Sequence, residues 1–107
     1  MFGSSISEAL AEAGATLISA SRSLERNEEF AERLGGEGYE AHALELDITE
    51  PDSIKALSAK VLERFGRLDV LVNSAVVARG GSFEEQTAEY WDYSARGNMV
   101  GLFAMCK

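Results

Sequence analysis

The sequence predicts an α/β fold in which a parallel sheet is covered by helices on both faces. Helical and strand patterns alternate along the chain and are joined by short connections, as in right-handed βαβ units. Residues 68–72 are rich in Leu and Val, with neither face alternating toward water, which is typical of a strand buried between two helical layers. An apolar content of 46% over 107 residues supports a single globular domain.

The first three elements follow from apolar spacing and from the glycines that end it. Residues 6–13 carry apolar side chains at helical intervals, and Gly14 supplies the stop. Residues 15–20 are short, apolar and partly β-branched, which predicts a strand. A charged amphipathic helix is predicted over residues 24–34, ended by the glycine pair at 35–36.

A second strand and a third helix are predicted next. Residues 40–46 alternate as a strand does. Thr49 is the expected N-cap of the following helix, with Pro51 in its first turn and Asp52 completing a capping-box spacing. The apolar stripe of this helix stops at Gly66.

The strand predicted over residues 68–72 is the centre of the expected sheet. In open α/β sheets ligands bind beyond the carboxyl ends of the strands, so Asn73 and the residues after it are expected beside a ligand. A glycine loop at 80–81 follows, and then a long helix from Thr87 to the end of the sequence.

Composition excludes several classes of partner. A net charge of −8 argues against a nucleic-acid backbone and against an anionic membrane surface. One cysteine and one histidine leave no internal disulfide and no set of metal ligands. The sequence shows no apolar run long enough for a membrane span and no secretory leader, so the cytoplasm is the expected compartment.

Five motifs at the βα junctions point to one family. They are L-A-E-A-G-A, A-S-R, D-I-T, L-D-V-L-V-N-S-A and N-M-V-G-L-F, in that order. Together they resemble the short-chain dehydrogenase/reductase family of Rossmann-fold, NAD(P)-dependent oxidoreductases. The resemblance implies that residues 1–107 form a partial NAD(P)-binding Rossmann domain that lacks the first strand.

The resemblance assigns cofactor roles to two turns. Phe2 and Gly3 match the end of the family's glycine-rich phosphate turn, although without the resemblance Gly3 is an ordinary helix-start glycine. Ser21 and Arg22 match the position that reads the adenosine ribose. Because an arginine offers donors to a 2′-phosphate, this pair favours NADP over NAD. Considered alone, Arg22 is equally compatible with a solvated loop.

Two further junctions are expected to line the cofactor. Asp47 and Ile48 match the pair that holds the adenine ring, although an Asp at this point is also a common turn residue. Asn73, Ala75 and Val76 match the residues that pass close to the adenosine ribose. Val76 stands where the family usually has glycine, and its β-branched side chain disfavours a positive φ and fills space beside the sugar.

Asn98 matches the family's helix asparagine, which extends a proton relay to the active-site lysine. The alternative is a structural amide bonded to a neighbouring carbonyl. Gly97 beside it is expected to cost the helix about 1 kcal/mol relative to alanine.

The catalytic groups of the family are absent from the sequence. The family uses a serine and a Y-x-x-x-K pair, whereas none of Tyr39, Tyr90 and Tyr93 has a lysine four residues later. The catalytic half is therefore expected beyond Lys107, and the chain as given is expected to be inactive.

The resulting prediction is a segment, truncated at both ends, of an enzyme that transfers a hydride between NADP(H) and an alcohol or ketone. Polyols, sugar acids and 3-oxoacyl thioesters are all within the family's range. The family resemblance implies a tetrameric or dimeric parent protein, whereas assembly of this chain is not expected. Two alternatives are a non-catalytic Rossmann-like remnant and a methyltransferase-type domain, and the latter favours an acidic residue in place of Arg22.

Overall fold

The computed structural model describes residues 2–107, and of Phe2 it describes only the backbone. The chain forms two compact units, Met1–Leu46 and Asp47–Lys107, called here the first and second unit. In chain order the elements are α1 (Phe2–Glu12), β1 (Leu17–Ser21), α2 (Leu24–Gly36), β2 (Ala41–Glu45), α3 (Pro51–Phe65), the 3₁₀ turn η1 (Phe83–Glu85), α4 (Ala88–Ala95), the π-helical turn η2 (Arg96–Gly101) and α5 (Leu102–Cys106).

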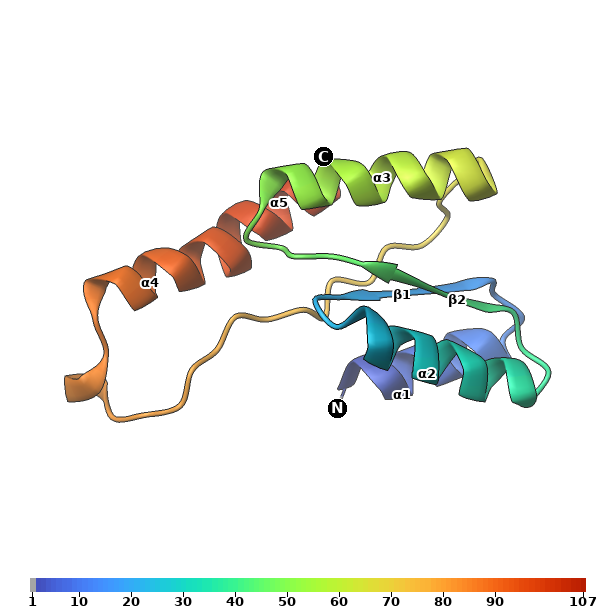
Figure 1. Cartoon of the computed structure of the whole chain (residues 1–107), viewed down its shortest axis with the longest axis horizontal. Helices are drawn as coiled ribbons and strands as arrows, with labels where there is room; N and C mark the ends of the chain where they lie inside the picture. The colour runs from blue at the N-terminus through green and yellow to red at the C-terminus, as the bar shows by residue number, and fades with distance from the viewer. Residues whose placement is uncertain (1) are drawn as a thin grey trace. The chain divides into compact units, whose positions relative to one another are not determined.

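The first unit is a parallel strand pair covered by two helices. β1 and β2 pair in parallel from Leu17 opposite Ala41 to Ser21 opposite Glu45. α1 and α2 lie on the same side of this pair (Figure 1). The apolar core joins all these elements and consists of Ala11, Leu17 and Leu34, with Phe30, Tyr39 and Ala41 packed against them. The predicted βαβ unit is confirmed, and its strands lie within two residues of the predicted limits.

Glycines end the helices, although not always where the pattern predicts. Gly14 and Gly66 follow α1 and α3 with φ of 93° and 75°, as expected for left-handed stops. α2 instead includes Gly35 and Gly36 and is capped by Glu37, while Gly38 takes the positive φ of 93°. The predicted end of α2 is therefore wrong by two residues, because Gly35 and Gly36 both keep helical backbone.

The start of α3 differs from the predicted capping box. Pro51 occupies the first turn as expected, but Glu50 is the N-cap residue and makes no side-chain cap bond. The Thr49 hydroxyl instead donates to Asp47 Oδ1 at 2.6 Å. The prediction of Thr49 as N-cap is wrong because this hydroxyl is used by the preceding turn.

The central strand predicted over residues 68–72 does not form. This segment is irregular and joins α3 to η1 (Figure 1). Within the described chain the only ladder joins β1 to β2. A strand needs backbone partners, and the neighbour expected for this one, the first strand of the Rossmann order, is not among the 107 residues. Val70, Leu71 and Val72 are consequently 61%, 38% and 43% exposed.

This apolar, unpaired segment is expected to promote self-association of the chain. Val70→Lys places a charge in it and is expected to lower the light scattering of concentrated solutions severalfold. Leu62→Lys is the matched control, because Leu62 is 55% exposed on α3 and lies outside the segment. Equal scattering by the two variants would attribute the effect to net charge alone and contradict the role of the segment.

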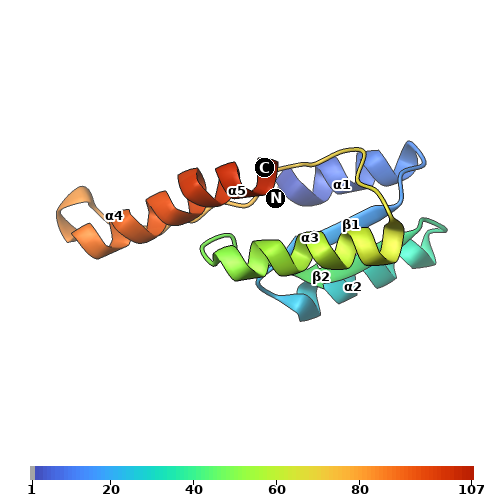
Figure 2. The same cartoon turned by 90° about the horizontal axis from the view of Figure 1, so that it is seen from above.

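The C-terminal helix of the second unit is continuous but contains a π turn. Thr87 caps α4 by accepting a hydrogen bond from the Tyr90 N–H, as expected for a helix starting near Thr87. α4, η2 and α5 then follow one another along one axis (Figure 2), and α5 contacts α3. None of the helices formed by residues 2–107 is long and apolar enough to cross a bilayer.

Candidate functional site

Five of the predicted site residues line one cavity of the second unit. Its volume is about 210 Å³. Asn73, Ala75 and Val76 come from the segment after the predicted strand, Ile48 from the turn before α3, and Asn98 from η2. The remaining lining residues are Gly97, Leu102 and Met105. The walls are mainly apolar, with two amide side chains among them.

Asn98 anchors the segment that follows the predicted strand. Its Oδ1 accepts from the Val77 N–H at 2.7 Å, and its Nδ2 donates to the Val77 carbonyl at 2.8 Å and to Ser94 Oγ at 3.1 Å. The side chain is thus engaged on both its oxygen and its nitrogen. These bonds agree with the alternative considered for Asn98, an amide that bonds a neighbouring carbonyl. The carbonyl is that of Val77, which lies on a different segment from the helix of Asn98.

The helix turn carrying Asn98 is a π turn, Arg96–Gly101. Single π turns inside α-helices are rare and occur often at functional sites, because they displace backbone carbonyls from the regular ladder. The relay role predicted for Asn98 is not tested by these contacts and remains a prediction.

Two glycines allow this helix to approach the rest of the unit closely. A Cβ at Gly97 would overlap the Val77 side chain, and one at Gly101 would overlap the Ile48 carbonyl oxygen. The helix-propensity cost predicted for Gly97 from the sequence therefore accompanies a close approach that a larger residue would prevent. The i, i+4 spacing of the two glycines was the signal available in the sequence, since it places both on one helix face.

The remaining cavity residues have ordinary backbone geometry. Asn73 Nδ2 donates to Cys106 Sγ at 3.6 Å, which links the cavity wall to the end of α5. Val76 is 68% exposed, and no residue other than glycine has a positive φ within the described chain. Val76 therefore occupies the usual glycine position without backbone strain, while its side chain adds bulk to the cavity.

Asp47 is held in a tight turn before α3. Its Oδ1 accepts from the Thr49 N–H at 2.9 Å and from the Thr49 hydroxyl, and its own N–H donates to Ser53 Oγ at 2.9 Å. The turn role considered as an alternative is thus present. These bonds fix the backbone that brings Ile48 to the cavity, and the role of Asp47 toward adenine remains a prediction.

The other predicted site residues belong to the first unit. Gly3 lies in the first turn of α1, and Phe2 is the first residue of that helix. Ser21 is the last residue of β1, where its hydroxyl donates to Asn27 Oδ1 at 2.7 Å. Arg22 is exposed in the turn between β1 and α2.

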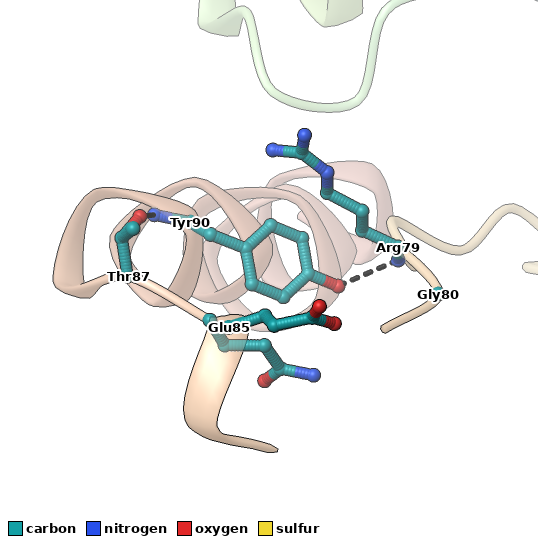
Figure 3. Close-up of a pocket in the computed structure, with 6 residues that line it drawn as sticks. Arg79, Gly80, Glu85, Thr87 and Tyr90 are labelled. Atoms are coloured by element: carbon teal, nitrogen blue, oxygen red, sulfur yellow. Dashed lines mark hydrogen bonds between the residues drawn. The ribbon is translucent and has the colours of Figure 1, made fainter. Parts of the chain in front are cut away.

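A second, more polar pocket of about 310 Å³ contains none of the predicted site residues. Figure 3 shows Tyr90 reaching from α4 to the loop at Arg79, where its hydroxyl accepts from the Arg79 N–H at 2.7 Å. Glu85 and Thr87 line the same pocket. This contact ties the glycine loop to α4. Residues 2–107 contain no cluster of side chains that could hold a metal ion.

Comparison with known proteins decides the family. The sequence model of the family described as short chain dehydrogenase matches residues 2–107. The chain belongs to the short chain dehydrogenase family. The family predicted from the five sequence motifs is therefore confirmed.

Named relatives of this family member include a dehydrogenase and a reductase. The D-threitol dehydrogenase of Mycolicibacterium smegmatis is 35% identical over 105 residues, which are 98% of this chain and 40% of that protein. The 3-oxoacyl-acyl-carrier-protein reductase of Staphylococcus aureus is 31% identical over 102 residues, 94% of this chain and 42% of that protein. The chain thus spans about two fifths of the length of these relatives.

Solved structures support the predicted fold class. The actinorhodin polyketide ketoreductase with NADPH superposes with a TM-score of 0.88 at 32% identity, covering 97% of this chain and 40% of that one. The alcohol dehydrogenase of Thermococcus sibiricus complexed with 5-hydroxy-NADP gives 0.87 at 35% identity, covering 96% and 44%. This member of the short chain dehydrogenase family therefore has an incomplete α/β, Rossmann-like fold.

Sequence reasoning missed residues that act through packing and hydrogen bonds. Thr49, Ser94 and Gly101 hold the turn and the helix around the cavity, although none was predicted as a site residue. Only Gly101 carried a detectable signal, its spacing from Gly97. The bonds of Thr49 and Ser94 depend on segments that the sequence pattern does not place next to them.

Proposed function

We propose that this chain is the cofactor-binding segment of an oxidoreductase that transfers a hydride between NADP(H) and an alcohol or ketone. The observation that carries the proposal is the convergence of four predicted cofactor-binding residues and the predicted relay residue Asn98 on one cavity. Two structural relatives with similar backbones are described with NADPH or 5-hydroxy-NADP, which supports NADP as the cofactor.

The residues present offer the chemical groups that a dinucleotide requires. Ala75 and Gly97 are small, so their backbones leave room at the cavity, and Asn73 offers an amide for sugar hydroxyls. Arg22 supplies a planar cation for a 2′-phosphate, and the first turn of α1 at Gly3 supplies N–H groups for a pyrophosphate.

Asp47, Ile48 and Asn98 complete the proposed assignment. Asp47 and Ile48 would hold the adenine ring, with Asp47 accepting from its amine. Because the Asn98 side chain is engaged by Val77 and Ser94, its contribution to a proton relay falls to its backbone carbonyl in the π turn. The bound cofactor supplies or accepts the hydride.

The parent protein is proposed to act on a small alcohol or ketone in the cytoplasm as a dimer or tetramer. D-threitol dehydrogenase and 3-oxoacyl reductase among the relatives support polyols and 3-oxoacyl compounds as candidate substrates. Within the 107 residues no tyrosine is followed four positions later by lysine, so hydride transfer requires residues outside this sequence.

Cofactor titration of wild-type and variant chains tests the proposal. Arg22→Ala is expected to weaken NADPH binding about tenfold and to leave NADH binding nearly unchanged, because it removes a charge-assisted contact to the 2′-phosphate. The measurement is calorimetry or NADPH fluorescence.

Arg26→Ala is the matched control for this titration, since Arg26 is an exposed arginine of α2 and the change in net charge is the same. The control is expected to keep NADPH affinity within twofold of the wild type. Equal losses in the two variants, or no binding of either cofactor by the wild-type chain, would contradict the proposal.

The second candidate is a non-catalytic Rossmann-like remnant that binds nucleotide or presents an interaction surface. Val76 supports it, because its side chain adds bulk to the cavity at the position where the family usually has glycine. Reduction of a ketone by a longer chain that carries residues 1–107 in frame, with NADPH as hydride donor, would reject this candidate.

A further inference from the structure

Asn27 is a buried polar residue on the inner face of α2. It is 5% exposed, and four hydrogen bonds surround its amide. Oδ1 accepts from Ser21 Oγ at 2.7 Å and from Ser19 Oγ at 3.4 Å. Nδ2 donates to the Leu44 carbonyl at 2.8 Å and to the Ser21 carbonyl at 3.3 Å. A single side chain thus joins α2 to the ends of both strands of the first unit.

These bonds use the amide to its capacity. An Asn side chain has two donor hydrogens and one oxygen with two lone pairs, and each of the four finds a partner here. Burying an amide is tolerated only with such partners, so the position is specified for hydrogen bonding and not for apolar packing.

The direction of the hydrogen bond between Ser21 and Asn27 decides whether the Ser21 hydroxyl at the end of β1 can donate to a ligand. Ser21 donates its hydroxyl proton to Asn27, which leaves the Ser21 oxygen as an acceptor for any other group. A phosphate dianion needs donors, whereas a sugar hydroxyl can donate to such an oxygen. Ser21 therefore cannot serve a 2′-phosphate through its hydroxyl while this bond is intact.

We propose that Asn27 is a positioning residue for cofactor selectivity. It holds the end of β1 that leads into Arg22, and it turns the Ser21 hydroxyl proton away from the cofactor. Arg22 then discriminates between a 2′-phosphate and a 2′-hydroxyl. Asn27 influences this discrimination only through the backbone of the turn that carries Arg22. This inference rests on the proposed function, because it assumes that the turn reads the adenosine ribose.

The test compares the affinities of the chain for 2′,5′-ADP and 5′-ADP by NMR titration. Asn27→Leu keeps the number and branching of the side-chain heavy atoms and removes all four hydrogen bonds. It is expected to reduce the preference for 2′,5′-ADP at least threefold, although a residue this buried cannot touch the ligand. Glu28→Ala, an exposed neighbour on α2, is the matched control and is expected to keep the wild-type preference.

Ser21→Ala provides a second readout that does not alter the core. Because Asn27 still bonds the Ser21 and Leu44 carbonyls, the preference is expected to stay within twofold of the wild type. If Ser21→Ala reduced the preference for 2′,5′-ADP as much as Arg22→Ala does, the Ser21 hydroxyl would donate to the phosphate directly. That result would overturn the role proposed for Asn27.

The remaining outcomes separate this inference from the proposed function. Binding of both nucleotides by Asn27→Leu with an unchanged preference would make Asn27 a purely structural residue. Binding of neither nucleotide by the wild-type chain would overturn the proposed function, and the role of Asn27 would fall with it. The dispersion of the NMR spectrum verifies in each case that the first unit is folded.

Discussion

Gly101→Ala is expected to destabilise the second unit by about 3 kcal/mol, toward the upper end of the usual cost of overpacking. The added Cβ would overlap the carbonyl oxygen of Ile48. Backbone atoms cannot rotate away as a flexible side chain can, so the helix must shift or the turn before α3 must open. Urea unfolding followed by the fluorescence of Trp91, the only tryptophan and a residue of α4, measures the loss.

Gly35→Ala is the matched control for this substitution. Gly35 lies inside α2, its backbone does not have positive φ, and a Cβ there would meet nothing within 4 Å. Alanine at such a site is expected to stabilise the helix by about 0.5 to 1 kcal/mol, which circular dichroism can follow. An unchanged midpoint for Gly101→Ala would contradict the close approach of the C-terminal helix to Ile48.

Asn98→Leu is expected to cost about 2 to 4 kcal/mol. Leucine has the same number and branching of side-chain heavy atoms but leaves the N–H and the carbonyl of Val77 without their side-chain partner. Each unsatisfied group costs about 1 to 3 kcal/mol when it is shielded from water. Hydrogen exchange offers a local measurement, because the Val77 amide is expected to be protected in the wild type and to exchange much faster in the variant.

Ser94→Ala is the control against which the stability loss of Asn98→Leu is compared. It removes a partner of Asn98 but preserves both bonds between Asn98 and Val77, so a cost of about 1 kcal/mol is expected. A Val77 amide that remains protected in Asn98→Leu would show that Asn98 does not hold this segment.

The contrast between the two glycine substitutions illustrates the limit of pattern reading. Gly35 and Gly101 are both helical glycines, and helix propensity alone predicts that alanine improves either position. Only the surroundings distinguish them, since one faces open space and the other faces a carbonyl oxygen. The same limit applies to Asn27 and Asn98, whose partners lie on other elements.

The sequence by itself determined the order of elements through β2, the helix starting after Thr87, the stops at Gly14 and Gly66, and the family. These features are encoded locally, because apolar spacing, caps and left-handed glycines act within a few residues. The motifs of the family likewise lie at the ends of such elements.

Only the tertiary structure decided which of these elements find partners. Residues 68–72 have the composition of a buried strand but form none, because a strand is completed by hydrogen bonds to a neighbour and the described chain offers it no ladder. The convergence of Ile48, Asn73 and Asn98 on one cavity, and the bonds that tie Asn27 to β1 and β2, depend on contacts between segments distant in sequence. Such contacts leave no periodic signal, since they are set by how the elements pack.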